Sequence, residues 1–282
     1  MKDNTANQFG GGWTEAKMEI VVNYAKAYLT IMNKQDWVKT LYFDGFAGSG
    51  LIEASEEKEA IKGTALRILE INEPKPFDIY YFVEKDKKNK EALDATIKEA
   101  YPNKKTYVVQ EDCNVKLITM AKYLKNNKNF RALVFVDPYG MSVNWTSIEK
   151  LEKLGIDLWI LVPTGVGVNR LLKNDGKIPE GWFKKLEDFL GLERNEIVNH
   201  FYSYKTVNTL FGDETAINKD VQIIQKIGDL YSQRLKTIFE HVSNSFVMRN
   251  KNNSIMYHFM MATNNKTALK LANDIINPKY KL

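Results

Sequence analysis

Cysteine and histidine are scarce in this chain of 282 residues. Cys113 is the single cysteine, and there are three histidines. One cysteine excludes a disulfide within the chain, and so few sulfur and imidazole groups argue against a structural zinc site. The scarcity of cysteine indicates a cytoplasmic protein.

Long apolar runs are missing as well. No stretch approaches the roughly 20 apolar residues that a membrane-spanning helix needs, and the mean hydropathy is -0.38. Residues 1–12 are polar and rich in glycine, without the apolar segment of a signal peptide. We therefore expect a soluble protein with a flexible tail at 1–12 and one domain at 13–282.

A strong excess of one charge is also missing. The chain has 40 basic and 35 acidic residues, which gives a net charge of +5 and an isoelectric point near 8.9. Such a balance permits contacts with nucleic-acid phosphates but does not indicate them. Hydrophobic residues make up 44% of the chain, which is enough for a large core.

Strands and helices alternate in the part of the chain that precedes residue 164. Five apolar runs predict strands at 40–46, 78–84, 106–109, 131–136 and 157–163. Helical patterns lie before and between them, at 13–33, 63–71, 85–100, 115–124 and 144–154. Since each parallel crossover needs about a dozen residues or more, the alternation predicts an α/β fold with a parallel sheet covered on both faces.

The second part of the chain breaks this alternation. Residues 165–218 contain no strong strand pattern, which predicts a helical insertion after the fifth strand. A long helix is expected at 219–240, and strands at 242–248 and 255–262 flank polar residues and predict an antiparallel hairpin. A last helix is expected at 266–276.

The first strand ends in the sequence DGFAGSG at 44–50, an acid followed by a loop with three glycines. Gly48 and Gly50 stand where a ligand can approach the backbone without a Cβ in the way. Because open α/β sheets bind ligands at the carboxyl ends of their strands, the loop predicts a nucleotide-like ligand; a plain tight turn is the alternative. The Gly-Lys-Ser/Thr ending of a phosphate-binding loop is missing, which argues against a nucleoside triphosphate.

Two further strands end at acids. Glu84 is suited to the two hydroxyls of a ribose, because a carboxylate accepts both hydrogen bonds, and Asp112 could accept from an adenine amine. The alternative is structural, since acids also favour the start of a helix, where Asp is an ordinary N-cap. Cys113 has no histidine partner in the sequence, which argues against a nucleophilic role.

The fourth strand ends at Asp137-Pro138-Tyr139-Gly140, the best catalytic candidate. A carboxylate that accepts from an exocyclic amine, beside an aromatic ring that stacks on a base, is what amine methylation requires. A strand-end turn shaped by proline and glycine is the alternative. Beyond the fifth strand, Arg170 offers a bidentate donor for phosphate or carboxylate.

Taken together, these motifs resemble the three-Cys-motif partner protein family, a methyltransferase-like group. The likeness rests on WTEAK at 13–17, DGFAGSG at 44–50, EDCN at 111–114, FVDPYG at 135–140, NR at 169–170 and YHFMMA at 257–262. It implies the Rossmann-like fold of class I methyltransferases, S-adenosylmethionine as cofactor, and a partner with a three-cysteine, radical-SAM-like motif. By this resemblance the cofactor contacts Asp44, Phe46, Gly48, Gly50, Glu84, Asp112 and Cys113.

The same resemblance implies catalysis at Asp137, Pro138 and Tyr139 and substrate binding at Asn169 and Arg170. Amino-methyltransferases of the wider family have Asp/Asn-Pro-Pro-Tyr/Phe at the catalytic turn. Here Tyr139 takes the place of the second proline and Gly140 that of the aromatic residue. The cofactor site therefore carries over better than the catalytic one.

Three hypotheses follow. The first is an S-adenosylmethionine-dependent methyltransferase acting on an amine of a nucleobase in DNA or RNA. The second is a non-catalytic subunit that binds cofactor or nucleic acid and depends on the three-cysteine partner for chemistry. The third is an oxidoreductase with a dinucleotide, against which the missing Gly-x-Gly-x-x-Gly order argues.

Overall fold

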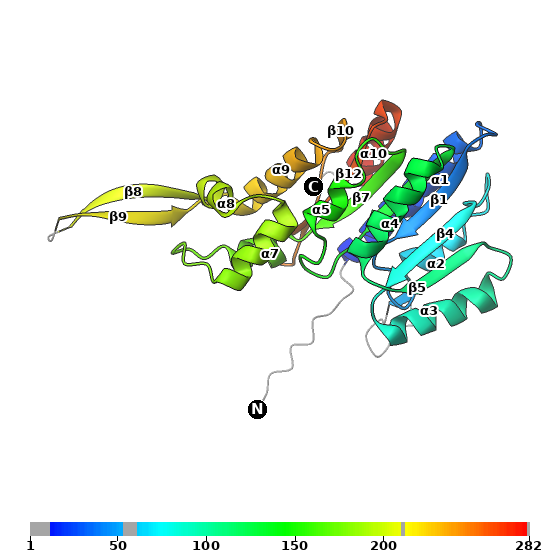
Figure 1. Ribbon diagram of the computed structural model, residues 1–282, viewed down its shortest axis with the longest axis horizontal. Coiled ribbons are helices and arrows are strands. Elements are labelled where there is room, and N and C mark those ends of the chain that lie inside the picture. Colours follow the sequence, from blue (N-terminus) through cyan, green and yellow to red (C-terminus); the bar gives the residue numbers. More distant parts are fainter. Residues whose placement is uncertain (1–11, 53–60, 210–211, 281–282) are drawn as a thin grey trace.

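The computed structural model describes residues 12–52, 61–209 and 212–280 (Figure 1). The tail predicted at 1–12 lies outside these residues except for Gly12, which begins helix α1 (Gly12–Met32). Among the described residues, no helix combines the length and the apolar character that a membrane crossing requires.

An eight-stranded sheet forms the centre of the protein. Its strands follow the order β10-β12-β7-β6-β1-β4-β5, and β11 also pairs with β12. The parallel strands are β1 (Lys39–Asp44), β4 (Ile79–Glu84), β5 (Thr106–Gln110), β6 (Phe130–Val136) and β7 (Ile156–Val162). The antiparallel strands are β12 (Ile255–Thr263), β10 (His241–Val242) and β11 (Phe246–Arg249). This arrangement confirms the predicted Rossmann-like, mostly parallel sheet of the class I methyltransferase type with antiparallel strands at its C-terminal end.

Burial on both faces explains why the central strands β6 and β7 are almost entirely apolar. All seven residues of β7 are buried, and in β6 only Arg131 is partly exposed. Parallel strands covered by helices on both sides have this continuous apolar pattern, because neither face of the strand meets water.

Helices cover the two faces of the sheet (Figure 1). One buried cluster joins a face of the sheet to α1, α2 (Thr64–Leu69), α3 (Lys87–Ala100) and α10 (Lys266–Tyr280). The other joins the opposite face to α4 (Cys113–Asn126), α5 (Trp145–Glu149) and α9 (Ile223–Leu235). A separate short pair, β2 (Leu51–Ile52) and β3 (Ile61–Lys62), follows the loop after β1.

The insertion after β7 is not helical throughout, which corrects the prediction for 165–218. It begins with the π-helix η1 (Thr164–Val168) and helices α6 (Asn169–Leu171), α7 (Glu180–Leu190) and α8 (Arg194–Phe201). It ends in an antiparallel hairpin of β8 (Tyr202–Thr209) and β9 (Gly212–Lys219), which extends away from the sheet (Figure 1). The hairpin forms a two-stranded sheet of its own, and its polar Ser, Thr, Asn and Lys residues give no apolar run that marks a strand.

Two smaller differences concern the C-terminal part. The helix expected at 219–240 begins at Ile223, because β9 continues to Lys219. The strand expected at 242–248 is divided into β10 and β11, and both pieces pair with β12. The hairpin prediction for this region is confirmed, with β11 and β12 antiparallel.

Candidate functional site

A pocket of about 430 Å³ opens at the carboxyl ends of β1 and β6. Helix α1 and strand β12 also contribute to its wall, through Lys17, Met18 and Tyr257. Seven of the predicted site residues line it: Asp44, Phe46, Gly48, Gly50, Asp137, Pro138 and Tyr139. The structure therefore brings the predicted cofactor residues of the glycine loop and the predicted catalytic turn into one pocket.

Asp44 is a buried carboxylate at the end of β1, with 1% of its surface exposed. Its Oδ1 accepts a hydrogen bond from the backbone N–H of Phe46 at 3.1 Å, and the Tyr42 hydroxyl lies 3.4 Å from Oδ2. Burial raises the pKa of Asp44 to about 7, while the Phe46 N–H opposes the rise and the nearby Asp137 adds to it. The acid is therefore poised to change charge near neutral pH.

The glycines of the following loop are required by its backbone conformation. Gly48 has φ +63° and Gly50 has φ +81°, both in the left-handed region. A Cβ on Gly50 would stand 2.7 Å from Cδ1 of Leu93, whereas nothing lies within 4 Å of the Cβ position of Gly48. The backbone at Gly48 is thus open to a ligand in the pocket.

Glu84 holds this loop from the neighbouring strand. Its Oε2 accepts from the Gly48 N–H at 2.9 Å, and its Oε1 accepts from the Asp86 N–H at 2.7 Å. Glu84 is 6% exposed and is absent from the pocket wall. In this structure it positions the glycine loop, and each of its oxygens keeps acceptor capacity for one further hydrogen bond.

Lys17 is the site residue that the sequence analysis missed. Its side chain comes from α1, is 7% exposed, and forms an ion pair with Asp137, whose side chain is 27% exposed. The signal was present, because Lys17 lies three residues before Ile20 and seven before Tyr24, on the apolar face of an amphipathic helix. A lysine at such a position needs a buried partner.

The turn predicted to be catalytic presents its three residues differently. Asp137 faces Lys17, Pro138 is buried, and the Tyr139 side chain is exposed at the rim of the pocket, with 67% of its surface accessible. Gly140 follows with φ +61°, which only glycine adopts without strain. An exposed ring beside a carboxylate is available to a planar ligand that enters the pocket.

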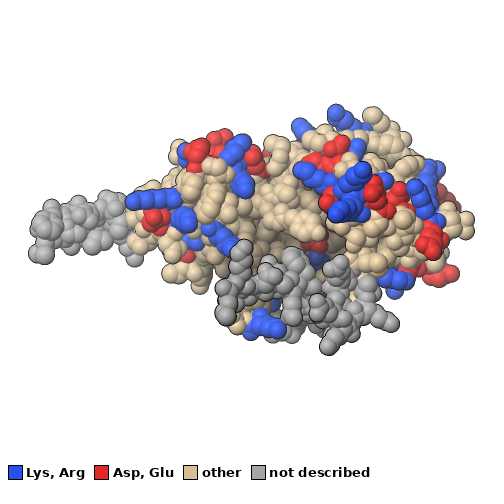
Figure 2. Space-filling model, turned by 90° about the horizontal axis from the view of Figure 1, so that it is seen from below, with Lys and Arg blue, Asp and Glu red and all other residues tan. Residues whose placement is uncertain are grey.

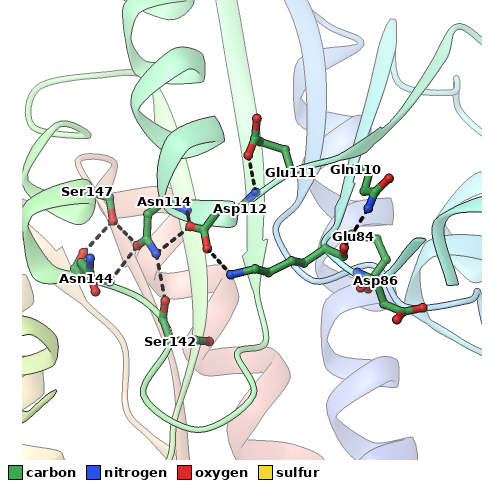
Figure 3. Close-up of polar contacts among 10 residues, drawn as sticks. Glu84, Asp86, Gln110, Glu111, Asp112, Asn114, Ser142, Asn144 and Ser147 are labelled. Carbon is green, nitrogen blue, oxygen red and sulfur yellow. Dashed lines mark hydrogen bonds and ion pairs between the residues drawn. The ribbon is translucent and has the colours of Figure 1, made fainter. Parts of the chain in front are cut away.

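Asp112 and Cys113 lie at the start of α4 and do not line the pocket. Asp112 is the N-cap: its Oδ1 accepts from the Asn114 N–H at 2.9 Å, and its Oδ2 lies 3.2 Å from Lys85 Nζ (Figure 3). Cys113 is buried, with a pKa raised by that burial, and its Sγ packs against Gly45. A thiol in this state is not a nucleophile.

Asn114 connects two of the loops at this edge (Figure 3). Its Oδ1 accepts from the Asn144 N–H and from the Ser147 hydroxyl, each at 2.7 Å, and its Nδ2 donates to the Ser142 carbonyl at 2.9 Å. The start of α4 is thereby tied to the loop that follows Asp137. These bonds join residues that lie far apart in the sequence. The sequence therefore places Asn114 in the EDCN motif but could not assign it a role.

Asn169 and Arg170 lie in α6 and are absent from the pocket wall. The Asn169 carbonyl accepts from Lys219 Nζ at 2.9 Å, which links the insertion to the end of its hairpin, and Arg170 is exposed. Neither of these two predicted substrate residues therefore lines the pocket that contains Asp137.

The strand order, with β12 antiparallel to β7, is the class I methyltransferase arrangement, and the pocket opens at the carboxyl edge of its sheet. No family model matches the sequence, and a search of curated proteins gives no match. Solved structures with a similar fold include protein LPL1258 from Legionella pneumophila, which is assigned to the family model DUF519. It shares 16% identity with this protein, over 91% of this chain and 99% of that chain, with a TM-score of 0.45.

Two other similar structures are Trm1 and an rRNA methylase. Trm1 from Pyrococcus horikoshii, in complex with S-adenosyl-L-methionine, shares 8% identity over 98% of this chain and 74% of that chain, with a TM-score of 0.41. The rRNA methylase from Streptococcus thermophilus shares 10% identity, over 72% of this chain and 93% of that chain, with a TM-score of 0.32. Since all three TM-scores are below 0.5, the fold class rests on the strand order itself.

Proposed function

We propose that this protein is an S-adenosylmethionine-dependent methyltransferase acting on an amine of a nucleobase in DNA or RNA. One observation carries the proposal: a single pocket joins the glycine loop after β1 to the Asp137-Pro138-Tyr139 turn after β6. A transferase needs its donor and acceptor sites side by side, because the two reacting atoms must meet.

The charges in the pocket fit the methionine end of this cofactor. That end carries a carboxylate and an ammonium group, and the pocket offers the Lys17 ammonium together with the Asp44 and Asp137 carboxylates. The open backbone at Gly48 admits a ligand, and the free acceptor capacity of Glu84 is compatible with ribose hydroxyls. When bound, S-adenosylmethionine supplies an electrophilic methyl group.

The residues of the turn would act on the substrate. As an ion-paired carboxylate, Asp137 accepts hydrogen bonds and can hold a target amine through its N–H groups. The exposed Tyr139 ring would stack on the base that carries the amine. Pro138 fixes the turn between the two.

Binding and transfer are tested separately. Thermal shift with S-adenosylmethionine, S-adenosylhomocysteine and NAD is expected to show stabilisation by the first two. Labelled methyl transfer to DNA and RNA is then expected for wild type and lost in Asp137→Ala, whereas Asp36→Ala, an exposed acid before β1, should behave as wild type. The cofactor claim fails if neither sulfur-containing ligand stabilises the protein, and stabilisation by NAD alone would favour a dehydrogenase.

The second candidate is a binding subunit that works with a three-cysteine-motif partner. The Lys17–Asp137 ion pair favours it, because the acid of the turn already has a partner. This candidate predicts cofactor binding without methyl transfer by the isolated protein, and transfer only after the partner is added. Activity of the isolated protein would exclude it.

A further inference from the structure

A row of three aromatic rings crosses β1, β4 and β5 on the face that carries α4. Phe43 is directly opposite Tyr81, and Tyr81 is directly opposite Tyr107, in the strand register. The centroids of Phe43 and Tyr81 are 5.8 Å apart with ring planes at 3°, and those of Tyr81 and Tyr107 are 6.0 Å apart at 33°. Phe43 is buried, Tyr81 is partly buried and Tyr107 is 45% exposed, so the row emerges onto the surface.

The exposed end of the row lies in a groove of about 290 Å³. Figure 1 shows β4 and β5 without a covering helix on the side where α4 lies over β1. Tyr123 of α4 forms part of the opposite wall, and two lysines, Lys105 and Lys116, also line the groove. Among the described residues, no acid lines it, and neither lysine has an ion-pair partner.

Sheet stability alone does not account for this surface. Cross-strand aromatic pairs stabilise a sheet, but they do so equally well when buried. Here Tyr107 and Tyr123 are 45% and 41% exposed and line a single groove. Apolar groups gathered in one place on a surface indicate a binding site.

We propose that this groove binds single-stranded nucleic acid, with bases stacked on Tyr107 and Tyr123 and phosphates at Lys105 and Lys116. The choice of nucleic acid rests on charge complementarity, because aromatic rings beside unpaired cations and without acids are what a single strand requires. Sheet faces with exposed aromatic residues stack bases in the same manner. The inference builds on the proposed function, since it gives that enzyme a second contact with its substrate.

The distance to the pocket edge suits this role. Tyr81 precedes Glu84 by three residues and Tyr107 precedes Gln110 by three, which corresponds to about 10 Å along a strand. A single strand of the roughly 4–16 nucleotides that such binding sites occupy is longer than this distance. Because the groove lies on the α4 face and the pocket is bordered by α1 on the other face, such a strand would pass around the carboxyl edge of the sheet to reach Tyr139.

Fluorescence anisotropy with labelled single-stranded RNA and DNA 12-mers tests the groove. We expect Tyr107→Ala to weaken binding about tenfold, because one stacked base is lost, and Tyr107→Phe to bind as wild type. Lys116→Ala should lower the slope of log K against log salt by about 0.7, the value for one phosphate contact on a single strand. The controls are Trp37→Ala, an aromatic residue 58% exposed elsewhere, and Lys26→Ala on the exposed side of α1.

Failure of the groove and failure of the enzyme give different results. If the methyl donor binds but Tyr107→Ala and Lys116→Ala retain wild-type oligonucleotide affinity and salt slope, the groove proposal is overturned and the methyltransferase proposal stands. If oligonucleotides bind through Tyr107 but no methyl donor binds, the methyltransferase proposal is overturned and the groove proposal stands. A dimer that dissociates in Tyr107→Ala, with oligonucleotide affinity unchanged, would show that a second copy occupies the groove and would overturn the proposal.

Discussion

Asp44 gives the pocket a pH dependence that can be measured as stability. Its pKa is raised by burial from 3.8 to about 7, so between these values the folded protein holds a proton that the unfolded chain has released. The contribution to stability is fully present below 3.8 and is lost as the pH rises through about 7. We expect Asp44→Asn, which cannot ionise, to show a smaller fall of Tm than wild type in calorimetry between about pH 5 and 8. Asp36→Asn should follow wild type, and equal slopes for all three proteins would contradict the raised pKa.

The same ionisation predicts how cofactor affinity depends on pH. If the Asp44 carboxylate receives the cofactor ammonium, affinity should increase with the ionised fraction, by about tenfold between about pH 6 and 8 for a pKa near 7. Titration calorimetry with S-adenosylhomocysteine measures this directly. In Asp44→Asn the affinity should be lower and nearly independent of pH. A wild-type affinity that stays constant over this interval would separate Asp44 from ligand binding.

Lys17 offers a second test at the level of a single residue. Lys17→Met keeps the length and the apolar stem of the side chain but removes the charge that faces Asp137. We expect affinity for S-adenosylhomocysteine to fall about tenfold or more, because the ligand carboxylate loses a buried charged donor. Lys26→Met, on the exposed side of the same helix, is the matched control. Equal affinities of the two variants would assign Lys17 to stability alone.

At the scale of elements, Asn114 joins the start of α4 to the loop after β6. Asn114→Ala removes its bonds to Asn144, Ser147 and Ser142, and we expect the free energy of unfolding to fall by about 2 kcal/mol. Methyl transfer should fall as well, because that loop carries the Asp137 turn. Urea unfolding and the transfer assay measure the two effects. Asn127→Ala, which removes one bond at the other end of α4, should cost less and leave transfer intact.

The sequence predicts elements well where burial is continuous and poorly where it is not. β6 is apolar except for Arg131 and β7 except for Asp157, so both could be placed to within about two residues, the usual uncertainty of boundaries. β8 and β9 were not predicted because they form a separate two-stranded sheet. They do not pack into the central sheet as its strands do, so their sequences need no apolar face. Strands that belong to the core of the central sheet can therefore be predicted from the sequence, whereas a hairpin that lies outside this core cannot.

The candidate site was predictable in part for a geometric reason. Parallel strands end at one edge, so Asp44 and Asp137 had to lie near each other. Asp112 also ends near this edge, but its side chain turns to the backbone N–H groups at the start of α4, as the N-cap alternative had it. Lys17 could be located on an apolar helix face, yet its partner lies 120 residues away and no local pattern names it.

At the scale of the whole molecule, one buried carboxylate connects three distant segments. Asp157 in β7 accepts from the Tyr24 hydroxyl of α1 at 2.7 Å and from the Thr263 hydroxyl of β12 at 2.5 Å. Removing a donor leaves a buried acceptor less satisfied, so Tyr24→Phe should lower the free energy of unfolding by about 1–3 kcal/mol. Chemical denaturation measures the loss, with Tyr204→Phe on the exposed hairpin as the control. A Tyr24→Phe variant as stable as wild type would show that this network adds nothing.

The position of β12 also has a consequence for the order in which the protein is made. β12 lies between β7 and the short strands β10 and β11, although it is the last strand in the sequence. A growing chain therefore presents one edge of β7, which is apolar except for Asp157, without a partner strand while the insertion and α9 are synthesised. Until β12 has left the ribosome, that edge can pair with a neighbouring nascent chain, so the rate at which residues 163–254 are translated bears directly on the yield of folded protein.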